Sequence, residues 1–142
     1  MALNWCFNEP WPTAANNSLV NWPARPKPAV KFVGDACRST LASARIPKFQ
    51  WLHSETFAAQ LWILNDSAQP CPSGVLRAEL VVGASRTVLL EWAFAEVAPF
   101  ENRAGPQVSG SLPREGGDFF VLDLSVEGRS GLSSSYRLSL RG

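Results

Sequence analysis

From about residue 38 to the C-terminus, apolar and polar side chains alternate with a period of two. In residues 76–82, Leu76, Ala78 and Leu80 alternate with Arg77 and Glu79, and residues 88–94 behave in the same way. Successive side chains of a β-strand point to opposite faces, so this pattern predicts strands with one buried face. Further runs of this kind occupy residues 41–46, 57–65, 107–112, 119–126 and 136–140.

The expected strands are separated by short segments of turn-forming residues, at 65–67, 72–74, 83–85, 116–118 and 128–131. About seven short alternating strands in roughly 105 residues are typical of an antiparallel β-sandwich of immunoglobulin type. The sequence therefore predicts an all-β, immunoglobulin-like domain over residues 37–142. The Cys-Trp-Cys core of antibody domains is absent, which favours a relative without a disulfide.

Residues 1–36 have a different composition. The first 28 residues hold five of the 11 prolines and three of the six tryptophans, Trp5, Trp11 and Trp22. Proline disrupts both long helices and central strands, so an irregular segment with a short strand is expected. Pro28 suits the first position of a helix, and the apolar spacing that follows predicts a short helix over 28–36.

Charge and cysteine content exclude several classes of partner and site. The formal net charge is +1, so neither nucleic acid nor a membrane surface is an expected partner. Cys6, Cys37 and Cys71 form no C-x-x-C pair, which indicates free thiols, no metal site and a reducing, cytoplasmic setting. The first basic residue is Arg25, so the N-terminus does not have the pattern of a signal peptide.

Candidate catalytic groups are few. His53 lies in an expected solvated turn, Ser133 to Ser135 have no base nearby in sequence, and Gly116-Gly117 opens onto a strand and not onto a phosphate-binding helix. Asp118 and Asp123 are five positions apart on an expected strand and so point to opposite faces. Three tryptophans lie in expected strands: Trp51, Trp62 and Trp92. A tryptophan in an alternating strand is more often a core residue than part of a sugar-stacking platform, but both interpretations stay open.

Two segments resemble a known family. Residues 5–12 (WCFNEPWP), followed by residues 25–29 (RPKPA), resemble the end of the catalytic barrel in family 2 glycoside hydrolases of the β-mannosidase and β-galactosidase type. There, a W-x-[LF]-N-[DE]-x-W-P segment forms the eighth barrel strand and its loop, and a K-P-A or K-A-L segment opens the last helix. An immunoglobulin-like sandwich follows the barrel, and residues 64–67 and 132–139 resemble two parts of that sandwich.

The resemblance implies that this chain corresponds to the C-terminal part of a retaining β-glycosidase: a remnant of the last barrel strand, loop and helix over 1–36 and a supporting sandwich over 37–142. The family's two catalytic glutamates lie on earlier barrel strands that have no match here, and Glu9 is not one of them. The chain alone is therefore expected to have no catalytic residue, no metal, no cofactor and no enzymatic activity. Trp5 falls where the family's tryptophan walls the sugar subsite, so it would contact substrate in an intact barrel.

The expected partner is the catalytic barrel of the parent. A barrel strand without its neighbours would leave its edge and its aromatic side chains unpaired, so a homodimer through the N-terminal aromatic segment is a further expectation. Two alternatives stay open: a carbohydrate-binding module with exposed aromatic side chains, and a stand-alone immunoglobulin-like interaction domain of the adhesion type.

Overall fold

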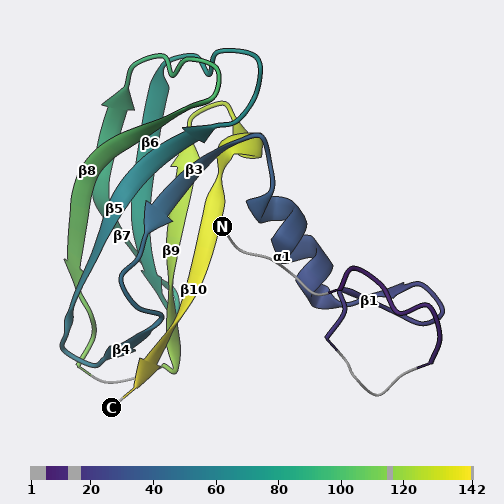
Figure 1. The fold of residues 1–142 in the computed structure, drawn as a ribbon. Coiled ribbons are helices and arrows are strands. Elements are labelled where there is room, and N and C mark those ends of the chain that lie inside the picture. The colour runs from purple at the N-terminus through teal and green to yellow at the C-terminus, as the bar shows by residue number, and fades with distance from the viewer. Residues whose placement is uncertain (1–5, 13–16, 115–116, 142) are drawn as a thin grey trace. The chain divides into compact units, whose positions relative to one another are not determined.

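The computed structural model describes residues 6–12, 17–114 and 117–141. The chain divides into two compact units, Met1–Arg38 and Ser39–Gly142. In the larger unit, strands form two sheets (Figure 1). Within the described ranges, no helix has the length and apolar character that crossing a membrane would require.

The smaller unit is irregular apart from one hairpin and one helix. Strands β1 (Val20–Asn21) and β2 (Arg25–Pro26) pair antiparallel, and α1 spans Pro28–Ala36. Proline at the first helical position fits because its missing N–H would have no partner within the helix. Lys31 and Asp35, four positions apart, form a salt bridge of 2.5 Å on the helix surface. The helix predicted over 28–36 is confirmed.

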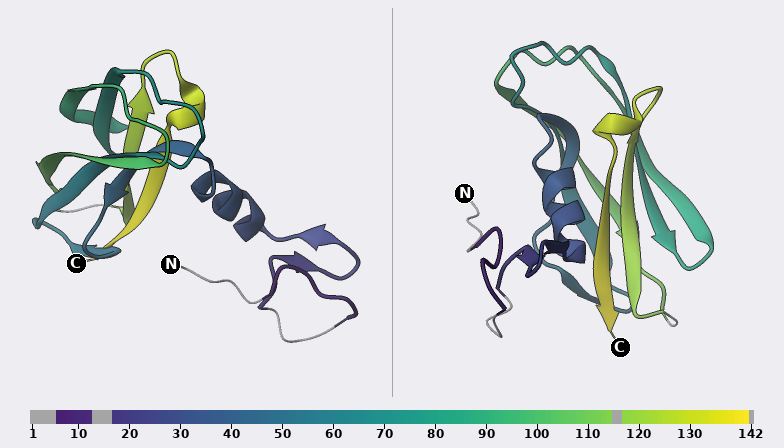
Figure 2. Two further views of the ribbon diagram at one scale, coloured as in Figure 1. Left: turned by 45° about the horizontal axis from the view of Figure 1, so that its top comes forward. Right: turned by 90° about the vertical axis from the view of Figure 1, so that its right-hand side faces the viewer.

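The larger unit contains a five-stranded sheet and a three-stranded sheet, which Figures 1 and 2 show from three directions. The five-stranded sheet has the order β4 (Gln50–Leu52), β10 (Ser134–Arg141), β9 (Phe119–Val126), β6 (Gly74–Val82), β7 (Ser85–Phe94). The three-stranded sheet has the order β3 (Thr40–Arg45), β5 (Thr56–Asn65), β8 (Glu101–Ser111). A 3-10 turn, η1 (Ser130–Leu132), precedes β10. The predicted all-β sandwich is confirmed.

The strand pairing differs from the prediction in two places. The expectation of about seven antiparallel strands missed β4, which has three residues and pairs parallel to β10. Three residues are too few to show an alternating pattern, so this strand depends on tertiary packing. β8 begins at Glu101, whereas the prediction began this strand at residue 107. Pro106 interrupts the apolar pattern and so hides the first half of the strand in the sequence. The strand itself continues through Pro106, because an edge strand tolerates proline.

Three aromatic rings form the centre of the core. Trp51, Phe57 and Phe120 are 0 to 3% exposed and come from β4, β5 and β9. Their ring centroids lie 5.1 Å (Trp51 to Phe57), 5.4 Å (Phe57 to Phe120) and 6.4 Å (Trp51 to Phe120) apart in edge-to-face arrangements. Such pairs add ~0.5 to 1.5 kcal/mol each beyond the burial of their area. Trp51 also donates from Nε1 to the Lys48 carbonyl at 3.0 Å, which fixes the short β4 against the core.

In the described part of the chain, Asn65 is the only polar residue whose side chain is fully buried, with 0% exposure. Its Nδ2 lies 2.9 Å from the Gln69 carbonyl oxygen, 3.2 Å from that of Val97 and 3.0 Å from that of Ala98. Its Oδ1 accepts from Thr40 Oγ1 at 3.0 Å, and from the backbone N–H and the hydroxyl of Ser67 at 3.2 and 2.7 Å. Asn65 therefore joins the start of β3 to two loops at one end of the sandwich.

Candidate functional site

Glu9 in the smaller unit is 7% exposed and belongs to a buried polar cluster. Its Oε1 accepts a hydrogen bond from Ser18 Oγ at 2.8 Å and lies 3.8 Å from Lys27 Nζ, which in turn donates to Ser18 Oγ at 3.2 Å. These contacts give Glu9 a role in the packing of the N-terminal unit. Trp5, the residue that the resemblance places at a sugar subsite, lies outside the described residues.

The turn that contains His53 is held by backbone and ring contacts. The His53 N–H donates to the Arg141 carbonyl at 2.8 Å, and its ring Nδ1 lies 3.2 Å from the Pro113 carbonyl oxygen. Glu55, two residues later, accepts from the Leu52 N–H at 2.9 Å and pairs with the Lys48 ammonium. The Leu52 N–H, and then Lys48, hold the pKa of the Glu55 carboxyl below its usual range. Across the described residues, no group of three or more His, Cys, Asp or Glu side chains could hold a metal ion.

The three strand tryptophans have different surroundings. Trp51 is 3% exposed in the core, and Trp92 is half-buried and packs against the core from β7. Trp62 does not face the core, because the buried positions of β5 are the odd-numbered residues and Trp62 shares the outer face with Gln60 and Leu64. The expectation that Trp62 is a core residue is therefore wrong. Residues 61–64 are all apolar, so the sequence alone does not show which face of this strand is the inner one.

Trp62 lies at the centre of the outer face of the three-stranded sheet. Ser43 on β3 and Ala104 on β8 are its neighbours in register. One row along, Gln60 lies between Arg45 and Gln107. This face thus combines one half-buried indole ring with the amide of Gln107 and the guanidinium of Arg45, while the Gln60 amide nitrogen already donates to the Gly105 carbonyl.

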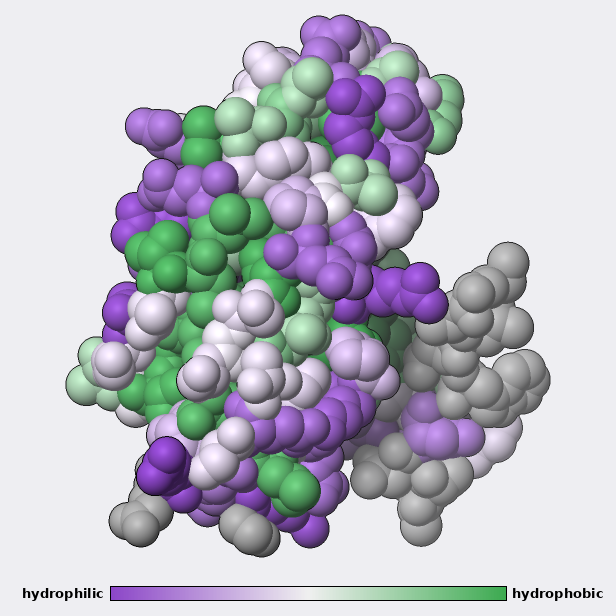
Figure 3. Space-filling view, turned by 90° about the vertical axis from the view of Figure 1, so that its left-hand side faces the viewer, coloured by the Kyte–Doolittle hydropathy of each residue, from purple (hydrophilic) through white to green (hydrophobic). Residues whose placement is uncertain are grey.

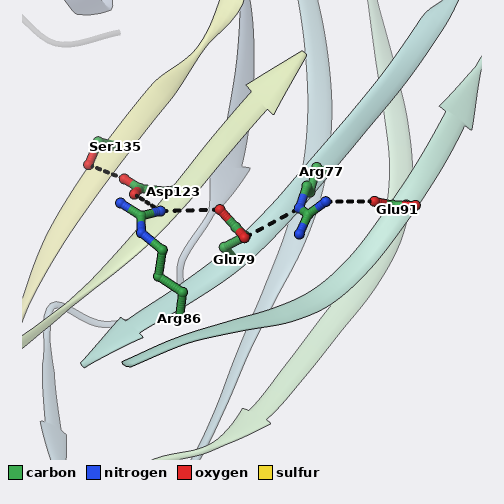
Figure 4. Close-up of polar contacts among 6 residues, drawn as sticks. All are labelled: Arg77, Glu79, Arg86, Glu91, Asp123 and Ser135. Atoms are coloured by element: carbon green, nitrogen blue, oxygen red, sulfur yellow. Dashed lines mark hydrogen bonds and ion pairs between the residues drawn. The ribbon is translucent and has the colours of Figure 1, made fainter. Parts of the chain in front are cut away.

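The outer face of the five-stranded sheet carries a row of alternating charges, which we call the charge ladder (Figure 4). Glu91 accepts from Arg77 at 3.2 Å, and Arg77 contacts Glu79 at 3.3 Å. Arg86 contacts Glu79 at 3.2 Å and Asp123 at 3.1 Å. Ser135 on β10 then donates to the other oxygen of Asp123 at 2.7 Å. The ladder crosses four strands, from β7 through β6 and β9 to β10 (Figure 4).

The open side of the sandwich is the side on which β7 and β8 are edge strands of their sheets. Two glycines of β8 make room there for large side chains of β7: a Cβ at Gly105 would lie 2.3 Å from Trp92 Cζ3, and a Cβ at Gly110 would lie 2.7 Å from Leu89 Cδ2. On the side along which β8 runs, apolar side chains form a broad area of surface (Figure 3). Val88 of β7 is 43% exposed, and Leu89, Leu90 and Trp92 are half-buried.

Sequence reasoning identified the residues of the charge ladder only as the polar positions of alternating strands. Arg77 and Glu79 already stood out as the outward positions of one strand, and Glu91 as an outward position of the next. Their pairing depends on register, because a shift by one residue would move each charge to the other face. The open side gave no sequence signal, since edge strands and central strands have the same period.

The sequence matches no family model and no curated protein. Solved structures with a similar fold include the CARDB domain of a protein from Pyrococcus furiosus. The solution structure of that domain is 13% identical over 72% of this chain and 94% of that chain, with a TM-score of 0.54. Its crystal structure in complex with di-metal ions is 12% identical over 72% of this chain and 92% of that chain, with a TM-score of 0.55.

A third similar structure is the alkylpurine DNA glycosylase AlkC of Pseudomonas fluorescens bound to DNA containing an abasic site analog. It is 12% identical over 80% of this chain, with a TM-score of 0.51, and the match covers 34% of that chain. Likeness at these identities shows the fold alone. The larger unit is thus an immunoglobulin-like β-sandwich.

Proposed function

We propose that this chain is a non-catalytic, immunoglobulin-like interaction domain that binds an extended protein segment along β7. The observation that carries this proposal is the open side. Within the described ranges β7 is hydrogen-bonded only to β6, and its ten residues present an unpaired backbone edge beside exposed apolar surface.

An unpaired strand edge can accept one more strand, because its outward N–H and C=O groups lack hydrogen-bond partners in the sheet. Side chains beside the edge then decide which segment fits. Here Val88 and the half-buried Leu89 and Leu90 offer apolar contacts on either side of the added strand. β8, the other long edge, has Pro106 in its middle, which lacks an N–H and disfavours strand addition.

The experiment is a selection of random peptides on the immobilised full chain, followed by NMR mapping of the selected peptides. We expect amide shifts centred on β7 and loss of binding in Val88→Lys, since a charge at an edge opposes strand addition. Gln107→Lys on β8 is the matched control and should bind normally. Peptides that map to another surface, or binding that Val88→Lys leaves intact, would refute the proposal.

A second candidate function is sugar binding on the outer face of the three-stranded sheet, and the outward position of Trp62 favours it. A partly exposed indole ring on the face of a sheet can stack on a sugar ring, and the exposed Gln107 could bond its hydroxyls. Oligosaccharides at millimolar concentration should then change tryptophan fluorescence saturably, and Trp62→Ala should abolish the change without unfolding the domain. Unchanged fluorescence would exclude this function.

The resemblance to family 2 glycoside hydrolases stays a prediction. In that setting the partner of the sandwich would be the catalytic barrel of the parent enzyme. The chain alone should not hydrolyse aryl β-mannosides or β-galactosides, because a retaining glycosidase needs two carboxyl groups ~5 Å apart. Turnover that disappears in Glu9→Gln would contradict the expectation.

A further inference from the structure

The inference concerns which segment pairs with β7, and it rests on the proposed function of this edge. Edge strands usually avoid self-association through charged side chains, proline, β-bulges or short length. β7 has ten residues and no proline, and its two charged residues, Arg86 and Glu91, have opposite signs. Opposite charges on one edge strand can attract a second copy of the same strand.

A bulge in β7 gives these two charges a common face. Ala78 of β6 pairs with Leu90, whereas the next residue, Glu79, pairs with Val88, so Leu89 is an extra residue in β7. In a regular strand, residues five positions apart would point to opposite faces. Because of the extra residue, Arg86 and Glu91 both lie on the outer face, where each takes part in the charge ladder (Figure 4).

We propose that β7 pairs antiparallel with β7 of a second copy about a two-fold axis between Val88 and Leu89. In this register Arg86 lies opposite Glu91 of the second copy, and Glu91 lies opposite its Arg86. Thr87 lies opposite Leu90 on the inner face, and Val88 and Leu89 bring apolar surface to the axis. The charge arrangement is self-complementary, so a single axis satisfies both copies at once.

Two contributions favour this pairing. The unpaired backbone groups of both edges form hydrogen bonds to each other, and the two five-stranded sheets become one continuous sheet. Opposite charges directly across a strand pair attract, and like charges at the same place repel. In the single copy Arg86 contacts Glu79 and Asp123 and Glu91 contacts Arg77, all on the side of β7 away from its open edge, so both side chains turn toward the second copy on pairing.

The test is the mass of the full chain in solution, measured by sedimentation equilibrium over a range of concentrations. We expect wild-type protein to dimerise, and Arg86→Glu and Glu91→Arg each to weaken the dimer by about tenfold or more, because each places like charges opposite one another twice. An equimolar mixture of the two variants should dimerise again. In the mixed dimer both contacts pair a glutamate with an arginine.

Two controls separate this result from effects on folding and from other dimers. The pair Arg103→Glu and Glu101→Arg on β8 changes an exposed ion pair of the other sheet and should leave the mass unchanged. Arg86→Glu also removes the contacts of Arg86 to Glu79 and Asp123, and Glu91→Arg removes that of Glu91 to Arg77, so thermal unfolding of each variant measures this separate cost. Each chain of the equimolar mixture keeps the same cost, so recovery of the dimer in the mixture reports pairing and not folding. A dimer through the N-terminal segment would disappear on deletion of residues 2–25, whereas a dimer through β7 would persist.

Two results would overturn the inference: a wild-type chain that stays monomeric at millimolar concentration, or single variants whose mixture does not restore the dimer. If the chain is monomeric while selected peptides still map to β7, the identity of the partner is wrong but the proposed function stands. If neither peptides nor a second copy bind at β7, both are wrong.

Discussion

Replacing Asn65 by alanine is expected to destabilise the sandwich more than almost any other single polar substitution. Six hydrogen-bond contacts end on this side chain, three at Nδ2 and three at Oδ1. Two amide hydrogens and two oxygen lone pairs limit the set to about four full-strength bonds. The carbonyls of Gln69, Val97 and Ala98 each keep another donor, so the main loss is the bonds themselves.

At ~0.5 to 1.5 kcal/mol net for each bond, the loss amounts to about 4 kcal/mol. For a domain of this size that corresponds to a fall in Tm on the order of 20 °C. Urea unfolding followed by tryptophan fluorescence measures the change, because the buried Trp51 reports on the core. Thr40→Val is the matched control: it removes one of the six contacts and should cost about 1 kcal/mol.

Asn65→Asp tests the same reasoning through pH. The new carboxylate would face three carbonyl oxygens in a buried position, and both effects raise its pKa in the folded state above that in the unfolded state. The unfolded chain then loses this proton at lower pH than the folded chain, so stability falls as pH rises through the acidic range. The variant should therefore be closer to wild type at pH 4 than at pH 7. If Asn65→Ala unfolds within about 1 kcal/mol of wild type, or if Asn65→Asp shows no such dependence, the buried network does not carry the stability assigned to it.

Three further predictions follow from other parts of the chain. Gly105→Ala should cost about 1 to 3 kcal/mol of folding free energy, because Trp92 must move to admit the methyl group. Gly131→Ala is the control and should be nearly neutral, because a Cβ there would have nothing within 4 Å. Equal Tm values for the two variants would contradict this prediction. Glu55→Gln should lower Tm at neutral pH but not in strong acid. The pKa of Glu55 is lowered in the folded state, so its stabilisation is present above the unfolded-state pKa and is lost as pH falls and Glu55 is protonated. A difference in Tm that persists in acid would exclude this cause. Deleting residues 2–25 should leave the sandwich folded and its unfolding cooperative, because the core of the sandwich lies within Ser39–Gly142. A truncated chain that does not unfold cooperatively would show that the two units do not fold separately.

Several features of the fold follow from local pattern. Alternation with period two places Leu76, Ala78 and Leu80 on one face whatever they pack against, so the strands and the all-β class are predictable. Pro28 and the apolar spacing after it are sufficient for a helix that ends at Ala36. Turn-forming residues mark most strand ends for the same reason, since turn conformation depends on a few adjacent residues.

The order of the strands, and with it the candidate site, depends on contacts between residues far apart in sequence. The parallel pairing of β4 with β10, the outward position of Trp62 and the edge position of β7 arise only when both sheets are assembled. The bulge at Leu89 likewise exists only relative to β6, and it alone gives Arg86 and Glu91 a common face. The long alternating strands can be read from the sequence, because that information lies in neighbouring residues. The short β4 and the identity of the unpaired edges cannot, because hydrogen bonding between strands is set by the whole sheet.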